Sequence, residues 1–170
     1  MQNIRYYHLI ICLNLLYGIF NSCQSGEKSE NTELPGGRAL MANLMDLDKT
    51  LSNKSDRVYL ILPNEGCEGC ISTAEYFVKE NFNRSHNLKF VFTKITSQKL
   101  LRIKLTDSVY NSSNVILDTA NAIKYPEVGK SIYPMIVYVE NGEVAEIKYQ
   151  NPESNGVYEI ENYLTNTAER

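Results

Sequence analysis

The apolar positions in the first half of the chain predict two amphipathic helices around one buried strand. Leucines and methionines recur at helical spacing over residues 38–53. Residues 58–62 form a continuous apolar run between polar neighbours, which is typical of a central strand covered on both faces. A polar turn over 64–69 leads into a second helix, whose apolar side consists of Ile71, Ala74, Phe77 and Val78.

The second half of the chain continues this alternation and adds a hairpin. Asn141-Gly142 separates two strand patterns, and this dipeptide is the strongest short signal for a two-residue hairpin turn. The expected strands are 88–95, 114–119 (a buried one), 135–140 and 143–149. The expected helices are 97–104, a single turn at 120–125, and a closing helix after Pro152.

This order of elements predicts the fold class. Alternating strands and helices indicate an α/β protein whose mixed sheet has a parallel centre and an antiparallel hairpin edge, flanked by helices. About 130 residues suffice to bury one core in this way. We therefore expect a single folded domain over residues 38–170.

Composition and charge remove some classes of function. Hydrophobic residues make up 43% of the 170 residues and charged residues 22%, which is ordinary for a globular protein. A formal charge of −3 leaves no broad basic footprint, so nucleic acid is not an expected partner. Four cysteines are too few for a small disulfide scaffold, and their positions carry more information than their number.

The first 22 residues predict an export signal. Arg5 provides a positive start, and residues 9–20 form an apolar run too short to span a bilayer. Phe20-Asn-Ser-Cys23 resembles the lipobox of bacterial lipoproteins, which implies cleavage before Cys23 and a lipid anchor on that cysteine. Phe20 and Asn21 depart from the family pattern. The alternative is an ordinary secretory signal with an incidental cysteine.

A polar segment follows Cys23. Residues 24–37 contain almost nothing apolar and predict a flexible tether, so the expected parts are 1–22, 23–37 and 38–170. A tethered domain behind a lipidated cysteine would face the periplasm of the bacterial cell envelope, attached to one of its membranes. Disulfides persist in that compartment.

The candidate chemistry lies in Gly66-Cys-Glu-Gly-Cys70, at the junction of the first strand and the second helix. Two thiols at this spacing can form a disulfide with little backbone movement. The helix N-terminus favours a thiolate and lowers the pKa of Cys67, whereas Glu68 raises it. Cys67 is expected to be the exposed thiol, and Cys70 lies one turn further in, where it could resolve a mixed disulfide.

Tyr133-Pro134, just before the hairpin, completes a resemblance to the thioredoxin-like proteins. Its other motifs are the strand–CxxC–helix unit and the closing helix, and the strand that ends at Asp118 is similar to the cytochrome-maturation and peroxiredoxin-like branches. The resemblance implies that Cys67 attacks, Cys70 resolves, Pro134 is a cis-proline and the Tyr133 backbone binds substrate. The chain departs from thioredoxin in having no Trp and no acidic residue in strand 58–62.

Several other readings of these residues exist. The cysteine pair could be purely structural, although closing so short a loop brings little entropic benefit. A copper carrier would need ligands beyond the two thiols, and a lone loop histidine such as His86 is more often solvated than a ligand. Haem attachment is excluded because Ile71 stands where that motif needs His. A peroxidase remains a third reading, and Pro134 could be an ordinary trans proline.

These observations predict a lipid-anchored thiol–disulfide oxidoreductase that needs no cofactor and no metal and contributes to redox homeostasis of the cell envelope. Its expected partners are the thiols and disulfides of exported proteins and a second redox protein. The alternative is a thioredoxin-fold binding or assembly lipoprotein whose dithiol is idle. The direction of electron flow, the substrate, the membrane and the oligomeric state stay open.

Overall fold

The structure, a computed structural model, describes residues 34–168, with side chains described to residue 165. Its helices are α2 (Gly37–Leu47), α3 (Glu68–Asn81), α4 (Gln98–Leu105), α5 (Asp107–Tyr110), the 3-10 turn η1 (Lys130–Ile132) and α6 (Gly156–Ala168). Its strands are β1 (Arg57–Pro63), β2 (Leu88–Thr93), β3 (Val115–Leu117), β4 (Met135–Glu140) and β5 (Glu143–Tyr149). The expected signal, the Cys23 anchor and most of the tether lie outside the described residues.

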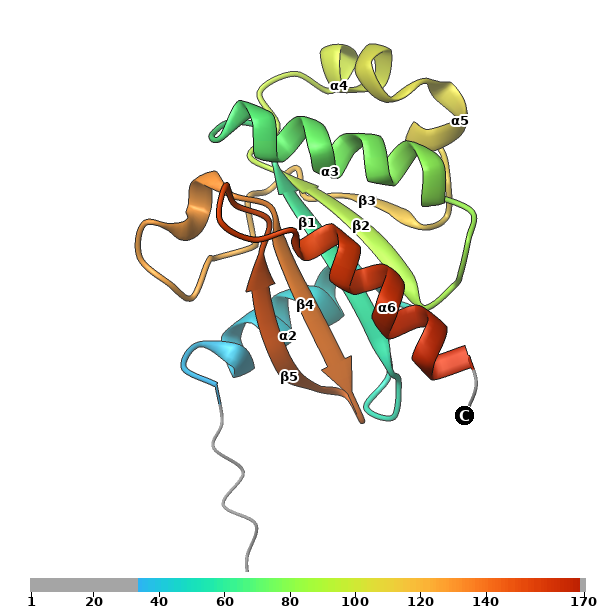
Figure 1. Ribbon diagram of the computed structural model, residues 1–170, viewed down its shortest axis with the longest axis vertical. Helices are drawn as coiled ribbons and strands as arrows, with labels where there is room; N and C mark the ends of the chain where they lie inside the picture. The colour runs from blue at the N-terminus through green and yellow to red at the C-terminus, as the bar shows by residue number, and fades with distance from the viewer. Residues whose placement is uncertain (1–33, 169–170) are drawn as a thin grey trace, which may run out of the picture. The chain divides into compact units, whose positions relative to one another are not determined.

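The five strands form one mixed sheet in the order β3-β2-β1-β4-β5 (Figure 1). The strands β3, β2 and β1 run parallel, β4 is antiparallel to β1, and β5 returns beside β4 as a hairpin. The predicted fold class, with a parallel centre and an antiparallel edge, is therefore confirmed. The Asn141-Gly142 turn lies where the sequence predicts it, with both residues at positive φ.

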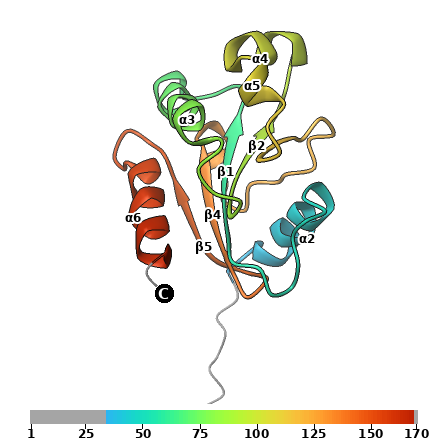
Figure 2. The ribbon, with the colours of Figure 1, turned by 90° about the vertical axis from the view of Figure 1, so that its right-hand side faces the viewer.

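Helices cover both faces of the sheet (Figure 2). On one face, apolar side chains of α3, α4, α5 and α6 pack on Val58, Leu60 and Leu62. On the other face, α2 packs with Leu40 and Leu44 on the side chains that alternate with these along β1. Because β1 is buried along its whole length, its apolar run has no polar face, as the sequence indicates.

Helix α2 ends at Leu47, six residues before the predicted end near Asn53. The next residue, Asp48, is buried and leaves the helix in an extended conformation. Its carboxylate accepts hydrogen bonds from Arg57 Nη1 at 2.5 Å, from the Tyr59 hydroxyl at 2.9 Å, and from both the backbone N–H and hydroxyl of Thr50. This network with β1 replaces the next helical turn.

The segment after β3 forms an irregular loop where the sequence predicts a helical turn. Asp118 has no exposed surface, and its carboxylate accepts hydrogen bonds from the N–H groups of Ala122 and Ile123 and from the Thr93 hydroxyl. These bonds take up backbone donors that a helix would use, and Asn121 adopts a positive φ. The preceding strand, β3, is a half-buried edge strand, not the fully buried one that was predicted.

Within residues 34–168, no helix combines the length and apolar character needed to cross a membrane.

Candidate active site

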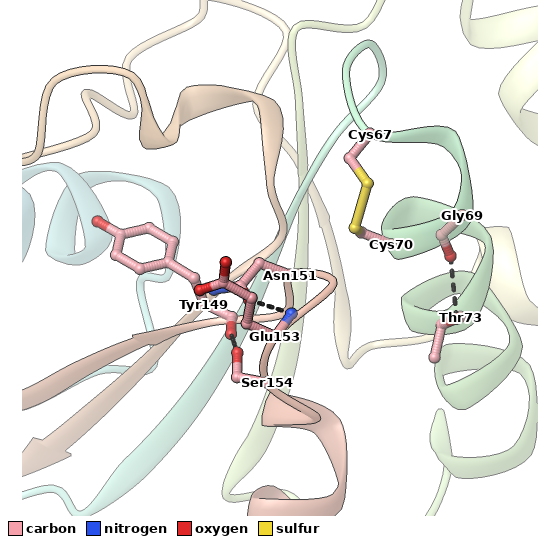
Figure 3. Close-up of a disulfide and its surroundings, with 8 residues drawn as sticks. All are labelled: Cys67, Gly69, Cys70, Thr73, Tyr149, Asn151, Glu153 and Ser154. Carbon is pink, nitrogen blue, oxygen red and sulfur yellow. Dashed lines mark hydrogen bonds between the residues drawn. A yellow bond between two sulfur atoms is a disulfide. The ribbon is translucent and has the colours of Figure 1, made fainter.

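Cys67 and Cys70 form a disulfide at the start of α3, directly beyond the end of the central strand β1 (Figure 3). Their Cα atoms are 5.3 Å apart. Cys67 is the N-cap residue of α3 and is half-buried, whereas Cys70 is only 6% exposed. A partner that approaches this disulfide from solvent therefore reaches the Cys67 sulfur more readily than the Cys70 sulfur.

The loop before β4 packs directly on the cysteine loop. The Cys67 N–H donates a 2.9 Å hydrogen bond to the Ile132 carbonyl. Gly66 makes this approach possible: it has φ +146°, and an added Cβ would lie 2.2 Å from the same carbonyl oxygen. The structure thus places the cysteine loop against Ile132, the residue directly before Tyr133-Pro134, although Ile132 comes 62 positions after Cys70 in the chain.

The described residues contain no cis peptide bond, so the bond before Pro134 is trans. The expectation of a cis-proline is therefore wrong. The turn η1 already reverses the chain, and Tyr133 leaves it extended at φ −108° and ψ 147°, a conformation that suits a residue before trans proline. The Pro134 carbonyl then accepts a hydrogen bond from Gln150 N–H at 2.9 Å, which continues the pairing of the hairpin strands.

Both backbone polar groups of Tyr133 have partners within the chain. Its N–H donates to the Lys130 carbonyl at 3.0 Å, and its carbonyl accepts the Tyr125 hydroxyl at 3.1 Å. A substrate that pairs with this backbone must use the second lone pair of the carbonyl or displace one of these bonds. The predicted role of Tyr133 in substrate binding stays a prediction.

An open groove of about 500 Å³ adjoins the disulfide, between the start of α3 and the β5–α6 loop. The loop wall consists of residues 150–155, and the α3 wall consists of Cys67, Gly69, Cys70 and Thr73. In Figure 3, Asn151 and Glu153 lie across from the two sulfur atoms. The loop is internally braced, because Asn151 Oδ1 accepts the Glu153 N–H and the Ser154 hydroxyl donates to the Tyr149 carbonyl.

One exposed carboxylate, that of Glu153, lines the groove, two more belong to the cysteine loop, and the buried carboxylates are engaged elsewhere. Glu65, Glu68 and Glu153 are exposed. The three buried acids of the described residues are Asp48, Glu75 and Asp118, and each has partners of its own. Glu75 forms a 2.7 Å ion pair with Lys104 of α4. A proton relay of the kind that thioredoxin carries in its first central strand has no counterpart in β1.

Beside the Pro134 loop, three tyrosines and Lys130 make a second cluster. The rings of Tyr125 and Tyr149 stack with centroids 6.4 Å apart, and Lys130 lies over both Tyr133 and Tyr149. Burial raises the pKa of Tyr125 and of Tyr149 above the ordinary tyrosine range. These hydroxyls therefore stay protonated at neutral pH, and the cluster braces the loop without contributing a base.

The other sequence candidates lie apart from the disulfide. His86 is exposed in the loop between α3 and β2, and no group of three His, Cys, Asp or Glu side chains that could hold a metal exists in the part of the chain that the structure describes. Asp118, which suggested a peroxidase, organises its own loop through the bonds described above.

Sequence reasoning missed the contact of Gly66 with Ile132 and the role of the β5–α6 loop. The glycine before the first cysteine was a local signal for a close backbone approach, but it does not name the segment that approaches. The mixed α/β sheet, its flanking helices and the Cys67–Cys70 pair are consistent with a thioredoxin-like fold. The sequence matches no protein-family model, and it has no significant match among curated proteins.

Proposed function

We propose that the protein is a thioredoxin-like thiol–disulfide oxidoreductase whose reactive groups are Cys67 and Cys70. One observation carries the proposal: a disulfide at a helix N-terminus presents its half-buried sulfur, that of Cys67, beside an open groove. A helix N-terminus stabilises a thiolate, and a thiolate is the group that attacks or leaves in disulfide exchange.

In the oxidising direction, a thiolate of the partner attacks the Cys67 sulfur, and the Cys67–Cys70 bond breaks with Cys70 leaving as a thiolate. A second thiolate of the partner then attacks the partner's sulfur in the mixed disulfide, and Cys67 leaves as a thiolate. The products are a partner disulfide and the reduced pair, so two electrons pass to the protein. The reverse sequence begins with attack by the Cys67 thiolate on a partner disulfide and ends with its displacement by Cys70.

Compartment and attachment form part of the same proposal. A lipid anchor at Cys23 would hold the domain on the periplasmic side of a bacterial membrane, where exported proteins carry thiols and disulfides. A second redox protein would restore the Cys67–Cys70 pair after each cycle. These points are supported by the signal-like segment, the lipobox-like residues before Cys23 and the polar segment that follows.

The redox equilibrium of the pair tests the proposal. Domain 34–170 is incubated in glutathione and dithiothreitol buffers, and the fraction of reduced Cys67–Cys70 is read from the mass added by an alkylating agent. A midpoint near about −270 mV indicates a reductant, and one near about −120 mV indicates an oxidant. Cys67→Ser should abolish exchange, and Cys70→Ser should accumulate a mixed disulfide. A pair that fails to exchange within hours contradicts the proposal.

A second candidate is a binding or assembly lipoprotein of the same fold with an idle dithiol. The observation that favours it is that Pro134 is trans and that both backbone groups of Tyr133 have partners, so the backbone that would pair with a substrate is already engaged. In this case, Cys70→Ser would trap no mixed disulfide with exported proteins, and the domain would capture its partner equally well with both cysteines replaced by serine.

A further inference from the structure

The groove beside the disulfide does not end at the first turn of α3. A second groove of about 250 Å³ runs between α3 and α6, and the two grooves share Thr73 and Asn155 as lining residues. The second groove is lined on the α3 side by Thr73, Tyr76, Phe77, Glu80 and Asn81, and on the other side by Asn155, Val157, Tyr158 and Glu161. Because they share these residues, the two grooves adjoin, and together they extend from Cys67 and Cys70 along α3; we call this pair of grooves the channel.

The channel exposes aromatic surface that the fold itself does not use. Tyr76 is 67% exposed and Tyr158 is 58% exposed, although both rings line the channel. Thr73, Tyr76 and Glu80 are spaced three and four residues apart, so they lie on one face of α3. The floor is apolar, because Phe77 and Val157 belong to the core beneath.

The charge of the channel is of one sign. Its lining residues include Glu80 and Glu161 in the α3–α6 part and Glu153 beside the disulfide, and none of them is Lys or Arg. Glu68 adds a further exposed carboxylate next to Cys67. At the edge of the channel, the guanidinium of Arg84 lies 3.6 Å from the Glu161 carboxylate.

We propose that this channel binds an extended segment of the partner protein next to its reacting cysteine, and that it selects segments with basic and aromatic side chains. The inference rests on the proposed function, because it deepens the description of the same site. From Cys67 to Glu80 the helix rises about 20 Å, which an extended chain covers with about six residues. Basic side chains complement Glu80, Glu153 and Glu161, and rings stack on Tyr76 and Tyr158. A second copy of this acidic chain would bring like charge into the channel.

Two synthetic peptides test the proposal. Each contains one cysteine and one tryptophan, and their flanking residues are lysines in the first peptide and glutamates in the second. Because the protein contains no Trp, peptide fluorescence reports binding directly. Binding is measured on the double variant Cys67→Ser, Cys70→Ser, and exchange is measured on the wild-type domain by the mass shift on alkylation. We expect the lysine peptide to bind and to exchange at least tenfold better at low salt, with the difference lost at about 1 M salt.

Substitutions in the channel test whether its side chains cause the preference for the lysine peptide. Glu80→Lys with Glu161→Lys should remove the preference for the lysine peptide, and Tyr76→Ser with Tyr158→Ser should weaken binding of that peptide at least fivefold. These side chains are at the surface, so the variants should keep the far-UV circular dichroism of the parent. As matched controls, Glu143→Lys on β5 and Leu100→Ser on α4 change an exposed carboxylate and an exposed apolar side chain outside the channel, and should have no effect.

The outcomes separate this inference from the proposed function. Equal binding and equal exchange of the two peptides would overturn the proposal that the channel selects the partner segment, while the exchange itself would still support an oxidoreductase. Charge-selective binding without exchange in any buffer overturns the oxidoreductase and leaves the channel standing. A dimer of the domain that is lost in the Tyr76 and Tyr158 variant would show that a second copy occupies the channel, and would also overturn the inference.

Discussion

Replacing Gly66 by Ala should separate the cysteine loop from the segment before β4. The added Cβ would lie 2.2 Å from the carbonyl oxygen of Ile132 and 2.7 Å from its Cα. Ordinary contacts between carbon and oxygen are about 3.3 Å, so the carbonyl must retreat by about 1 Å. The hydrogen bond from Cys67 N–H, now 2.9 Å long, cannot survive a displacement of that size.

Two costs add up in this variant. Holding a non-glycine residue at the φ of +146° found here costs about 1–3 kcal/mol, and losing the hydrogen bond costs about 1 kcal/mol. We therefore expect Gly66→Ala to lower the free energy of unfolding by about 2–4 kcal/mol. Urea denaturation of the oxidised domain, followed by far-UV circular dichroism, measures this quantity.

Gly69→Ala is the matched control, three residues further along. Gly69 lies in the first turn of α3, and a Cβ built there meets no atom within 4 Å. The alanine should raise the free energy of unfolding by about 0.5 kcal/mol, because it restricts the unfolded chain. A cost below about 1 kcal/mol for Gly66→Ala, or an equal change in the free energy of unfolding in the two variants, would contradict this prediction.

Three further variants probe the site and its support. Asp48→Asn should cost about 3 kcal/mol at neutral pH by leaving a buried guanidinium without its charge partner. Burial raises the pKa of Asp48, but its hydrogen bonds outweigh burial and hold that pKa below the ordinary value. The carboxylate therefore stabilises the fold above about pH 4 and loses this effect as the pH falls through the lowered pKa, so urea curves of the two proteins should converge in acid. Tyr125→Phe removes the hydroxyl bonded to the Tyr133 carbonyl; it should cost about 1 kcal/mol and speed exchange with a peptide thiol, and an unchanged rate would show that this bond does not limit access. Glu68→Gln should stabilise the Cys67 thiolate and make the pair more oxidising in glutathione buffers, and a shift toward a stronger reductant would contradict the assumed repulsion.

Local patterns were sufficient for the sheet. The apolar run of β1 and the Asn-Gly turn between β4 and β5 depend on neighbouring residues alone, and both lie where the sequence places them. The errors occur where a buried carboxylate forms hydrogen bonds or an ion pair that the periodicity of apolar residues does not reveal. Asp118 takes the donors that the predicted turn at 120–125 needed, and Asp48 ends α2 early because it pairs with Arg57.

In the candidate site, too, some features follow from the local sequence and others do not. The position of Cys67 and Cys70 at a strand–helix junction follows from spacing, and so does the greater burial of Cys70. The trans bond at Pro134 does not follow from spacing, because η1 determines how the chain enters β4. The channel lined by Tyr76 and Tyr158 was not foreseen either, since it exists only where two helices distant in sequence lie on the same face of the sheet.

The place where the chain enters the domain affects how the domain would sit on a surface. Gly37, at the start of α2, lies against Val144 at the start of β5, and Val144 pairs with Val139, which lies opposite Arg57 at the start of β1. The disulfide follows the other end of β1, so the height of the sheet, about 20 Å, separates it from the entry point (Figure 1). A domain held from its N-terminal side would therefore point its sulfurs outward, and a partner as large as a folded protein could reach them without meeting whatever holds the domain.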